Sequence, residues 1–327
     1  MARWKKFLLG VSGIFVLALL IAWLGWVVLP LRALEATHPP VPHNLVIAHR
    51  GASYWAPEET QPAYELAREL GTDYLEMDIQ RTKDFALVAI HDDTLERTTN
   101  VAELFPGREK QTISEFTLAE LKQLDAGYWF NRKHPGLARS SYSGQRILTL
   151  GEILDIAGAK GRKCPVYIET KSADHYPGIE RDLVALLREK GWLEPGDGGL
   201  PPVIFQSFYS DSLMKLKELA PNIPRIYLVE SQVLKKEGGW APMLDRAAQI
   251  GAGIGPMGTL CWPWNVGSAH RHGLTVHAFT LDEPWQFRLM AWFGVDGLFT
   301  NRCDALLDYY GRPSAKSARS LLDELGY

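Results

Sequence analysis

Glu76 and Asp78 are acidic residues within an apolar run, residues 74–80, whose composition predicts a β-strand. Side chains two positions apart in a strand point to the same side, so both carboxylates face one region. A second apolar run repeats this spacing with Glu169 and Lys171. Three carboxylates are hard oxygen ligands, which suit Ca²⁺ or Mg²⁺ better than a soft metal. The sequence therefore predicts a site for one divalent cation.

Two more apolar runs end in a histidine next to a charged residue, as His49-Arg50 and His91-Asp92. A pair of imidazoles can supply a general base and a general acid. Arg50 and Lys171 supply positive charge for an anion such as phosphate. Each feature alone has an ordinary explanation, such as a solvated face, a hydrogen-bonded core histidine or an ion pair within a strand. Ionisable groups at four strand ends of one chain favour a common site instead, because unpaired burial is costly.

The elements that must position these residues are short strands separated by helical patterns. Nine runs predict strands, at 45–49, 74–80, 87–91, 166–171, 203–208, 225–229, 253–256, 275–280 and 297–300. This alternation predicts a parallel sheet closed as a TIM (β/α)8 barrel. Nine is one too many, and residues 81–86 are too few for a helical crossover. Either the second and third runs form a hairpin, or one run is not a barrel strand.

Helix starts are marked by two capping boxes, Thr117-Leu-Ala-Glu120 and Thr149-Leu-Gly-Glu152. Further helices are predicted at 178–190, 210–219, 241–250, 265–272 and 283–293. Residues 93–147 form a longer polar connection beyond a strand end, where barrels carry their functional loops. We expect the barrel domain to span 45–310 and the tail, 311–327, to be helical.

The N-terminus carries an uncharged segment, residues 7–29. As a helix it would reach roughly 34 Å, enough to cross a hydrocarbon core of about 30 Å. Three basic residues precede it, so the positive-inside rule predicts a single-pass anchor with the catalytic domain on the non-cytoplasmic side, the periplasmic face of the inner membrane in a bacterium. A cleaved signal peptide is the alternative, but the run is long and 33–36 make a poor cleavage site. Residues 31–44 are then a linker.

Overall composition is ordinary for a globular protein of 327 residues, with 35 basic and 38 acidic side chains and a net charge of −3. No basic block occurs in the sequence, so we expect no nucleic-acid partner. The three cysteines, Cys164, Cys261 and Cys303, lack a Cys-x-x-Cys spacing that would suit zinc. We expect three buried thiols, although an exported chain could oxidise one pair.

Five spaced motifs resemble those of the glycerophosphodiester phosphodiesterase family. They are His49-Arg50-Gly51, Pro57-Glu58-Glu59-Thr60, Glu76-x-Asp78, His91-Asp92 and Glu169-x-Lys171. Residues 116–127, 206–208 and 294–301 are also similar to family patterns. The resemblance implies a TIM-barrel enzyme that uses one divalent cation, usually Ca²⁺ or Mg²⁺. Members cleave glycerophosphodiesters to glycerol 3-phosphate and an alcohol.

Carried over by position, the resemblance implies a role for each motif residue. The expected metal ligands are Glu76, Asp78 and Glu169; the acid–base pair is His49 and His91; the phosphate-binding residues are Arg50 and Lys171. Glu58 is expected to hold these residues in place without binding the metal or the phosphate itself. The chain departs from the family at Glu59, usually Asn, which could add a ligand or face outward. It also departs at 278–281, where the family often has Trp-Thr-Val-Asn, and at Asn301, where the family has Asp.

Two alternatives stay open at this point. One is a lysophospholipase D-type enzyme that cleaves lysophospholipids at the membrane. The other belongs to a different class, an inactive membrane-anchored barrel that acts as a binding or scaffold protein. The sequence does not indicate the head group or the oligomeric state.

Overall fold

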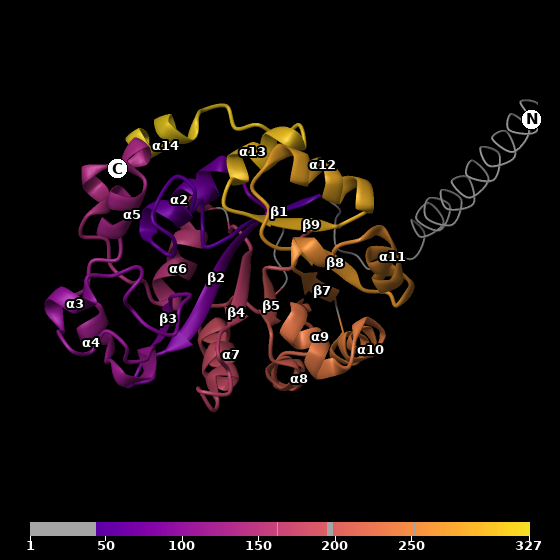
Figure 1. Cartoon of the computed structure of the whole chain (residues 1–327). Helices are drawn as coiled ribbons and strands as arrows, with labels where there is room; N and C mark the ends of the chain where they lie inside the picture. The colour runs from indigo at the N-terminus through magenta and orange to yellow at the C-terminus, as the bar shows by residue number, and fades with distance from the viewer. Residues whose placement is uncertain (1–43, 162, 195–198, 252) are drawn as a thin grey trace, which may run out of the picture.

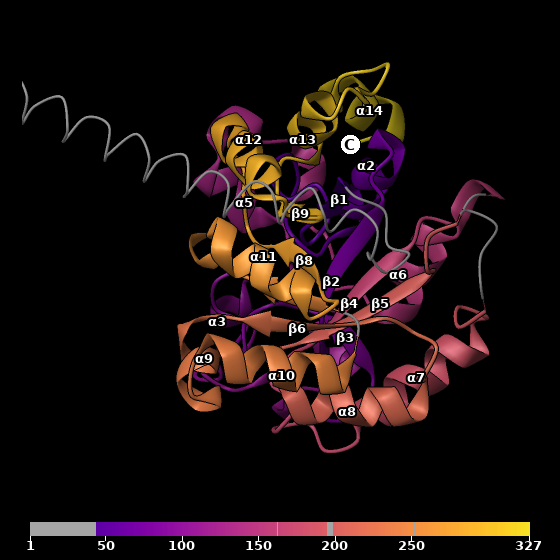
Figure 2. The ribbon, with the colours of Figure 1, turned by 90° about the vertical axis from the view of Figure 1, so that its right-hand side faces the viewer.

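The chain folds as an α/β barrel in the computed structural model, which describes residues 44–161, 163–194, 199–251 and 253–327 (Figures 1 and 2). Its strands are β1 Leu45–Ala48, β2 Tyr74–Arg81, β3 Leu87–Ala89, β4 Val166–Thr170, β5 Val203–Ser207, β6 Arg225–Val229, β7 Gly253–Pro256, β8 Thr275–Ala278 and β9 Gly297–Thr300. Neighbours in the sheet run β1-β9-β8-β7-β6-β5-β4-β2, and a β1–β2 pairing closes the ring. All of these pairings are parallel, so the predicted eight-stranded barrel is confirmed.

The strand that does not belong to the barrel is β3, which forms a hairpin with β2. β3 pairs antiparallel with β2, and Ile79 lies opposite Ala89. The five residues between them, 82–86, suffice to connect two antiparallel strands, whereas a parallel pair requires a long crossover. The hairpin reading of the two runs is therefore confirmed. It places His91 just beyond the strand that folds back along β2.

Helices cover the outside of the barrel (Figure 1). They are α2 Gln61–Leu70, α6 Leu150–Ala157, α7 Ile179–Glu189, α8 Ser210–Leu219, α9 Ser231–Glu237, α10 Trp240–Ile250, α11 Pro263–Arg271, α12 Pro284–Phe293, α13 Cys303–Tyr309 and α14 Ala318–Leu325. The capping box at Thr149 is formed, since its side chain accepts from Glu152 N at the start of α6. The last helix, α14, packs against α2.

Two apolar layers hold the barrel together. The larger lies between the strands and the helices and includes Ala67, Ile168 and Leu213. A smaller cluster fills the inside of the barrel, where Tyr74 and Tyr167 pack edge to face at 5.6 Å between ring centroids. A filled interior keeps the strand ends rigid, so the polar side chains that emerge beyond it have fixed positions.

Residues 93–147 are a folded connection with an apolar cluster of its own around Leu95, Phe116 and Leu121. It contains α3 Val101–Leu104, α4 Leu118–Leu121 and α5 Tyr128–Lys133. The capping box at Thr117 is also formed, because Glu120 N donates to the threonine side chain. The connection therefore holds its first residues, next to His91, in a defined place.

The predicted anchor, residues 7–29, and all but residue 44 of the predicted linker lie outside the described residues. Within the part of the chain that is described, no helix has the length and apolar character needed to cross a membrane. The three cysteines are buried thiols, as expected.

Candidate active site

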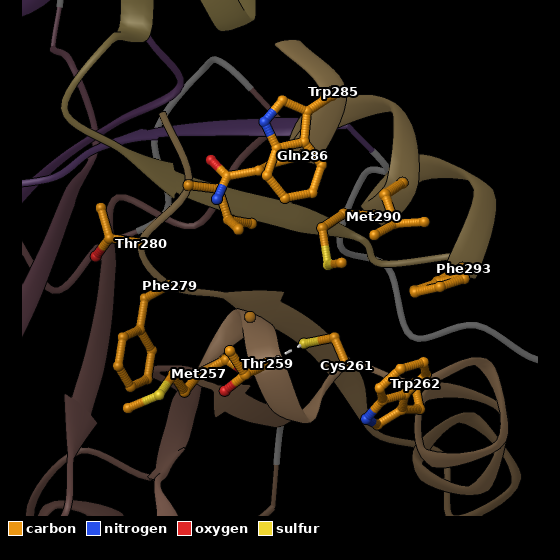
Figure 3. A pocket seen from close by; sticks show the side chains of 13 residues that line it. Met257, Thr259, Cys261, Trp262, Phe279, Thr280, Trp285, Gln286, Met290 and Phe293 are labelled. Atoms are coloured by element: carbon orange, nitrogen blue, oxygen red, sulfur yellow. Dashed lines mark hydrogen bonds between the residues drawn. The ribbon is translucent and has the colours of Figure 1, made fainter. Parts of the chain in front are cut away.

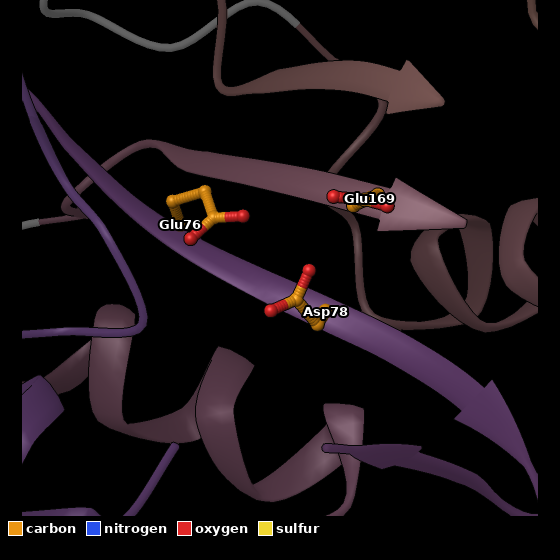
Figure 4. Close-up of side chains that lie close together, drawn as sticks. All are labelled: Glu76, Asp78 and Glu169. Atoms are coloured by element: carbon orange, nitrogen blue, oxygen red, sulfur yellow. The ribbon is translucent and has the colours of Figure 1, made fainter. Parts of the chain in front are cut away.

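Three carboxylates converge at the carboxyl ends of neighbouring strands (Figure 4). Glu76 and Asp78 project from β2 and Glu169 from β4, and Asp78 lies directly opposite Glu169 in the sheet register. One oxygen from each residue lies within 4.8 Å of the other two, and all three side chains are buried. The spacing in the sequence thus predicted a real cluster, and its atoms have the chemistry of a hard-cation site.

Two cations flank this cluster. Arg50 Nε lies 2.9 Å from Asp78 Oδ2, and the Arg50 backbone N–H donates to Glu76 Oε2 at 2.8 Å. Lys171 Nζ lies 3.0 Å from Glu169 Oε1 and 3.8 Å from Asp78 Oδ1. Both cations were predicted as phosphate ligands from their places beside the acids. The structure places both beside the carboxylates and in the lining of one pocket.

The backbone at Arg50 is bent to make these contacts. Arg50 has a φ of +56° and Gly51 a φ of +81°, both in the left-handed region that favours glycine. A Cβ on Gly51 would lie 2.7 Å from the Ala63 carbonyl carbon. Glycine at this position therefore allows the turn that brings the Arg50 N–H to Glu76.

The three acids differ in their pKa values. Burial raises the pKa of Glu76 well above its usual range. Burial also raises the pKa of Glu169 to about 8, although Lys171 acts in the opposite direction. Burial also opposes ionisation of Asp78, but Lys171 and Arg50 hold the pKa of that carboxyl well below its usual range. Raised carboxyl pKa values mean that two of the acids lack full positive compensation, which a divalent cation would supply. The donor set therefore fits Ca²⁺ or Mg²⁺.

Gln206 on β5 adds to the same group. Its Nε2 donates to Glu76 Oε1 at 2.9 Å, whereas its buried Oε1 accepts no hydrogen bond from the described residues. The sequence marked Gln206 only as part of a family-like motif. Its amide orients Glu76 and leaves an oxygen available at the edge of the cluster.

His49 is held in one tautomer by two residues far along the chain. Its Nδ1 lies 2.8 Å from Asn301 Oδ1, and Asn301 Nδ2 donates to Asp282 Oδ2 at 2.7 Å. Because the Asn301 amide nitrogen donates to Asp282, the Asn301 amide oxygen is the atom that faces His49. The hydrogen of the His49 ring therefore lies on Nδ1. Burial and the neighbouring Arg50 lower the pKa of His49 to about 3. A neutral imidazole with a lone pair on Nε2 results.

His91 has a different environment. Its Nδ1 lies 2.6 Å from Asp92 Oδ1, so the imidazole has a carboxylate neighbour. Arg97 pairs with that same carboxylate through Nε, at 2.5 Å, and bonds both oxygens of Glu58 at 2.9 and 2.7 Å. Glu58 in turn accepts from Arg50 Nη1 at 3.0 Å. Glu58 thus links the two arginines beside the pocket. Arg97 was not singled out from the sequence, although the family-like stretch that follows His91 includes it.

Glu59 neither faces outward nor joins the three clustered acids. Its side chain is buried, its Oε1 accepts from the Asp78 backbone N–H at 2.9 Å, and Tyr64 donates to its other oxygen. Burial and the nearby Asp78 raise its pKa well above the usual range. Glu59 therefore stabilises the β2 backbone at Asp78.

Six of the predicted residues line one pocket at this end of the barrel, whereas Asp78 and Glu58 are not part of its lining. Its lining includes His49, Arg50, Glu76, His91, Glu169 and Lys171. Apolar side chains, among them Phe208, Phe279 and Phe299, form the rest of the wall. The pocket therefore combines acids, cations and two imidazoles in a partly apolar setting.

Comparisons with known proteins identify the family of this chain. A model of the glycerophosphoryl diester phosphodiesterase family matches residues 49–305. The chain is 38% identical over 304 residues to a glycerophosphodiester phosphodiesterase of Bacillus subtilis, covering 90% of this chain and 95% of that protein. It is 35% identical over 266 residues to one from Caldanaerobacter subterraneus, covering 81% and 97%.

Solved structures give the same result. A putative glycerophosphoryl diester phosphodiesterase from Silicibacter pomeroyi superposes with a TM-score of 0.71 at 27% identity, over 87% of this chain and 98% of that chain. A phosphodiesterase from Oleispira antarctica, solved with the product sn-glycerol-3-phosphate, gives 0.64 at 28% identity, over 82% and 96%. The chain belongs to the glycerophosphoryl diester phosphodiesterase family and is a phosphoric diester hydrolase.

Proposed function

We propose that this enzyme hydrolyses glycerophosphodiesters to glycerol 3-phosphate and an alcohol, using one divalent cation and two histidines. One observation carries the proposal: three buried carboxylates lie within 4.8 Å of one another, and two of them, Glu76 and Glu169, line a pocket that His49 and His91 also line. The names of its relatives in Bacillus subtilis and Caldanaerobacter subterraneus support the substrate class. An inactive scaffold barrel is disfavoured, since such a protein has no need of this arrangement.

Glu76, Asp78 and Glu169 would hold Ca²⁺ or Mg²⁺, which supplies positive charge against the phosphate oxygens when it is bound. Arg50 and Lys171 contribute positive charge from the protein itself. Arg50 is fixed by Asp78 and Glu58, so its guanidinium need not be ordered when substrate binds. Preorganised charge of this kind stabilises the negative charge that builds up in the transition state.

The two imidazoles divide the proton transfers between them. His49 is the base, since its Nε2 carries a lone pair while Nδ1 is committed to Asn301. It accepts the proton of the attacking hydroxyl, which belongs to water or to the substrate's own glycerol. His91 is the acid, because His49 takes the role of base and the Asp92 carboxylate, 2.6 Å from His91 Nδ1, orients the second imidazole. It gives its proton to the departing alkoxide as the P–O bond to the alcohol breaks.

A direct test is choline release from glycerophosphocholine. The purified enzyme is stripped with a chelator, then supplied with Ca²⁺ or Mg²⁺. We expect no turnover after stripping and recovery with at least one of the two ions. Full activity in the stripped enzyme, or no activity with either ion, contradicts the proposal.

For location, we propose that residues 7–29 anchor the enzyme with its barrel on the non-cytoplasmic side of the membrane. The uncharged run and the preceding basic residues support this. Fractionation and protease accessibility of the full chain in intact spheroplasts test it. Recovery of the barrel in a soluble, protease-resistant cytoplasmic fraction contradicts it.

A further inference from the structure

An apolar hollow lies beside the catalytic pocket, between the loops after β7 and β8 and helix α12 (Figure 3). It encloses about 730 Å³ including its open mouth. Residues that line it include Met257, Phe279, Leu281, Trp285, Leu289 and Phe293. Of the described residues that form its wall, none carries a charge. A hollow of this composition gains little from a polar ligand and suits a hydrocarbon group.

The hollow adjoins the catalytic pocket, and the two spaces share part of their wall. Phe279 and Thr280, directly after β8, line both spaces. On the catalytic side, the Phe279 ring meets the Phe208 ring edge to face at 5.9 Å between centroids. A ligand whose phosphate lies near Lys171 would therefore reach the hollow by passing Phe279 at this shared wall.

Large apolar side chains remain exposed at the mouth of the hollow. Trp285 is 64% exposed and Trp262 is 50% exposed, with the Trp262 ring stacked on Trp264. Exposed apolar surface gathered at one place, rather than scattered singly, marks a binding surface. Its position next to an anion site matches a molecule with a phosphate at one end and a hydrocarbon chain at the other.

We infer that the hollow binds the acyl chain of a monoacyl glycerophosphodiester while the phosphate occupies the catalytic pocket. This inference rests on the proposed function and extends its substrate class. The reaction is the same hydrolysis: an oxygen from water becomes bonded to phosphorus, the P–O bond to the head-group alcohol breaks, and that alcohol takes a proton. The products are a monoacylglycerol phosphate and the alcohol. We assign one chain to the hollow, because it adjoins the catalytic pocket along one shared wall.

The experiment compares substrates that differ only in the chain. Glycerophosphocholine, 1-hexanoyl- and 1-octanoyl-glycerophosphocholine are hydrolysed by the metal-loaded enzyme below their micelle concentrations. Burial of a methylene is worth at most about fourfold in kcat/KM. We expect kcat/KM for the octanoyl substrate to exceed that for glycerophosphocholine at least tenfold. Octylphosphocholine should inhibit competitively at lower concentration than a short-chain analogue.

Two tryptophans on α12 provide a matched pair of variants. Trp285 lines the hollow, whereas Trp292, equally exposed at 64%, does not. Trp285→Glu should lower the octanoyl-to-glycerophosphocholine ratio of kcat/KM at least tenfold. Trp292→Glu should leave that ratio within twofold of the wild-type value.

The outcomes separate this inference from the proposed function. Hydrolysis of glycerophosphocholine with no gain from the acyl chain overturns the acyl site and leaves the proposed function standing. No hydrolysis of any of the three substrates overturns both. Equal effects of the two variants, seen only when the substrate is presented in phosphatidylglycerol vesicles, overturn the acyl site in favour of a surface that rests on the bilayer.

Discussion

His49 Nδ1 lies 2.8 Å from Asn301 Oδ1, a hydrogen bond between residues 252 positions apart in the chain. The two residues follow β1 and β9, which are adjacent parallel strands. Asp282 fixes the amide of Asn301 by accepting from its Nδ2. The hydrogen on His49 is thereby placed on Nδ1, away from the catalytic pocket.

Replacing Asn301 should impair the chemical step more than binding. In Asn301→Ala, the imidazole loses the partner that sets its tautomer, and we expect kcat to fall about 10–100-fold with KM within threefold. Asn301→Asp should also lose activity, because it places a second carboxylate against Asp282. Adding Asp282→Asn to that variant restores the donor–acceptor pattern and should recover most of kcat. Unchanged kcat in Asn301→Ala contradicts this role.

Loss of either histidine should stop turnover without removing the cation. His49→Ala and His91→Ala each remove one proton-transfer group, and such groups contribute about 10²–10⁴ in rate. Calorimetric titration with Ca²⁺ or Mg²⁺ should still show one bound ion, because neither histidine belongs to the carboxylate cluster. Near-normal activity in both variants would exclude the acid–base assignment.

Glu169→Gln should raise the cation concentration needed for activity. The variant keeps the shape of the side chain but removes one of three clustered negative charges, so we expect the half-saturating ion concentration to rise at least tenfold. Glu180→Gln is the matched control, since Glu180 is also buried but lies on α7, outside the cluster. Equal ion requirements in the two variants would exclude Glu169 as a ligand.

His277, inside the barrel, should make the fold sensitive to acid. Its Nδ1 lies 3.0 Å from the Tyr167 hydroxyl, and burial lowers its pKa to about 4 from an ordinary 6.5. Between these values the unfolded chain takes up a proton that the folded chain does not. Stability therefore falls as the pH drops from about 6.5 to about 4 and is fully present above 6.5.

Urea unfolding at pH 7 and pH 5, with chelator present, measures this effect. We expect His277 to account for about 2 kcal/mol of the stability lost between the two pH values. His277→Asn, which can still accept from Tyr167, should show a loss smaller by that amount. His272→Asn, at an exposed position after α11, is the control and should behave like the wild type. Identical pH dependence in all three proteins would exclude the effect.

The sequence by itself determined the elements and the chemistry they carry. Alternation along a strand places Glu76 and Asp78 on one side whatever the rest of the chain does. The short connection after β2 excludes a helical crossover, and apolar runs separated by helices favour a closed parallel sheet. These are local properties, so the strands, the capping boxes and most of the charged pocket could be read directly from the residues.

Only the tertiary structure decided which distant residues meet. The partners of His49 and of Glu58, namely Asn301 and Arg97, come from other connections whose paths no local pattern specifies. The direction of Glu59 depends on Tyr64 and on the Asp78 backbone N–H, so it could not be predicted from its position. The apolar hollow likewise exists only because the segments after β7 and β8 meet α12. Contacts of this kind depend on closure of the barrel, which brings together segments that the chain keeps far apart.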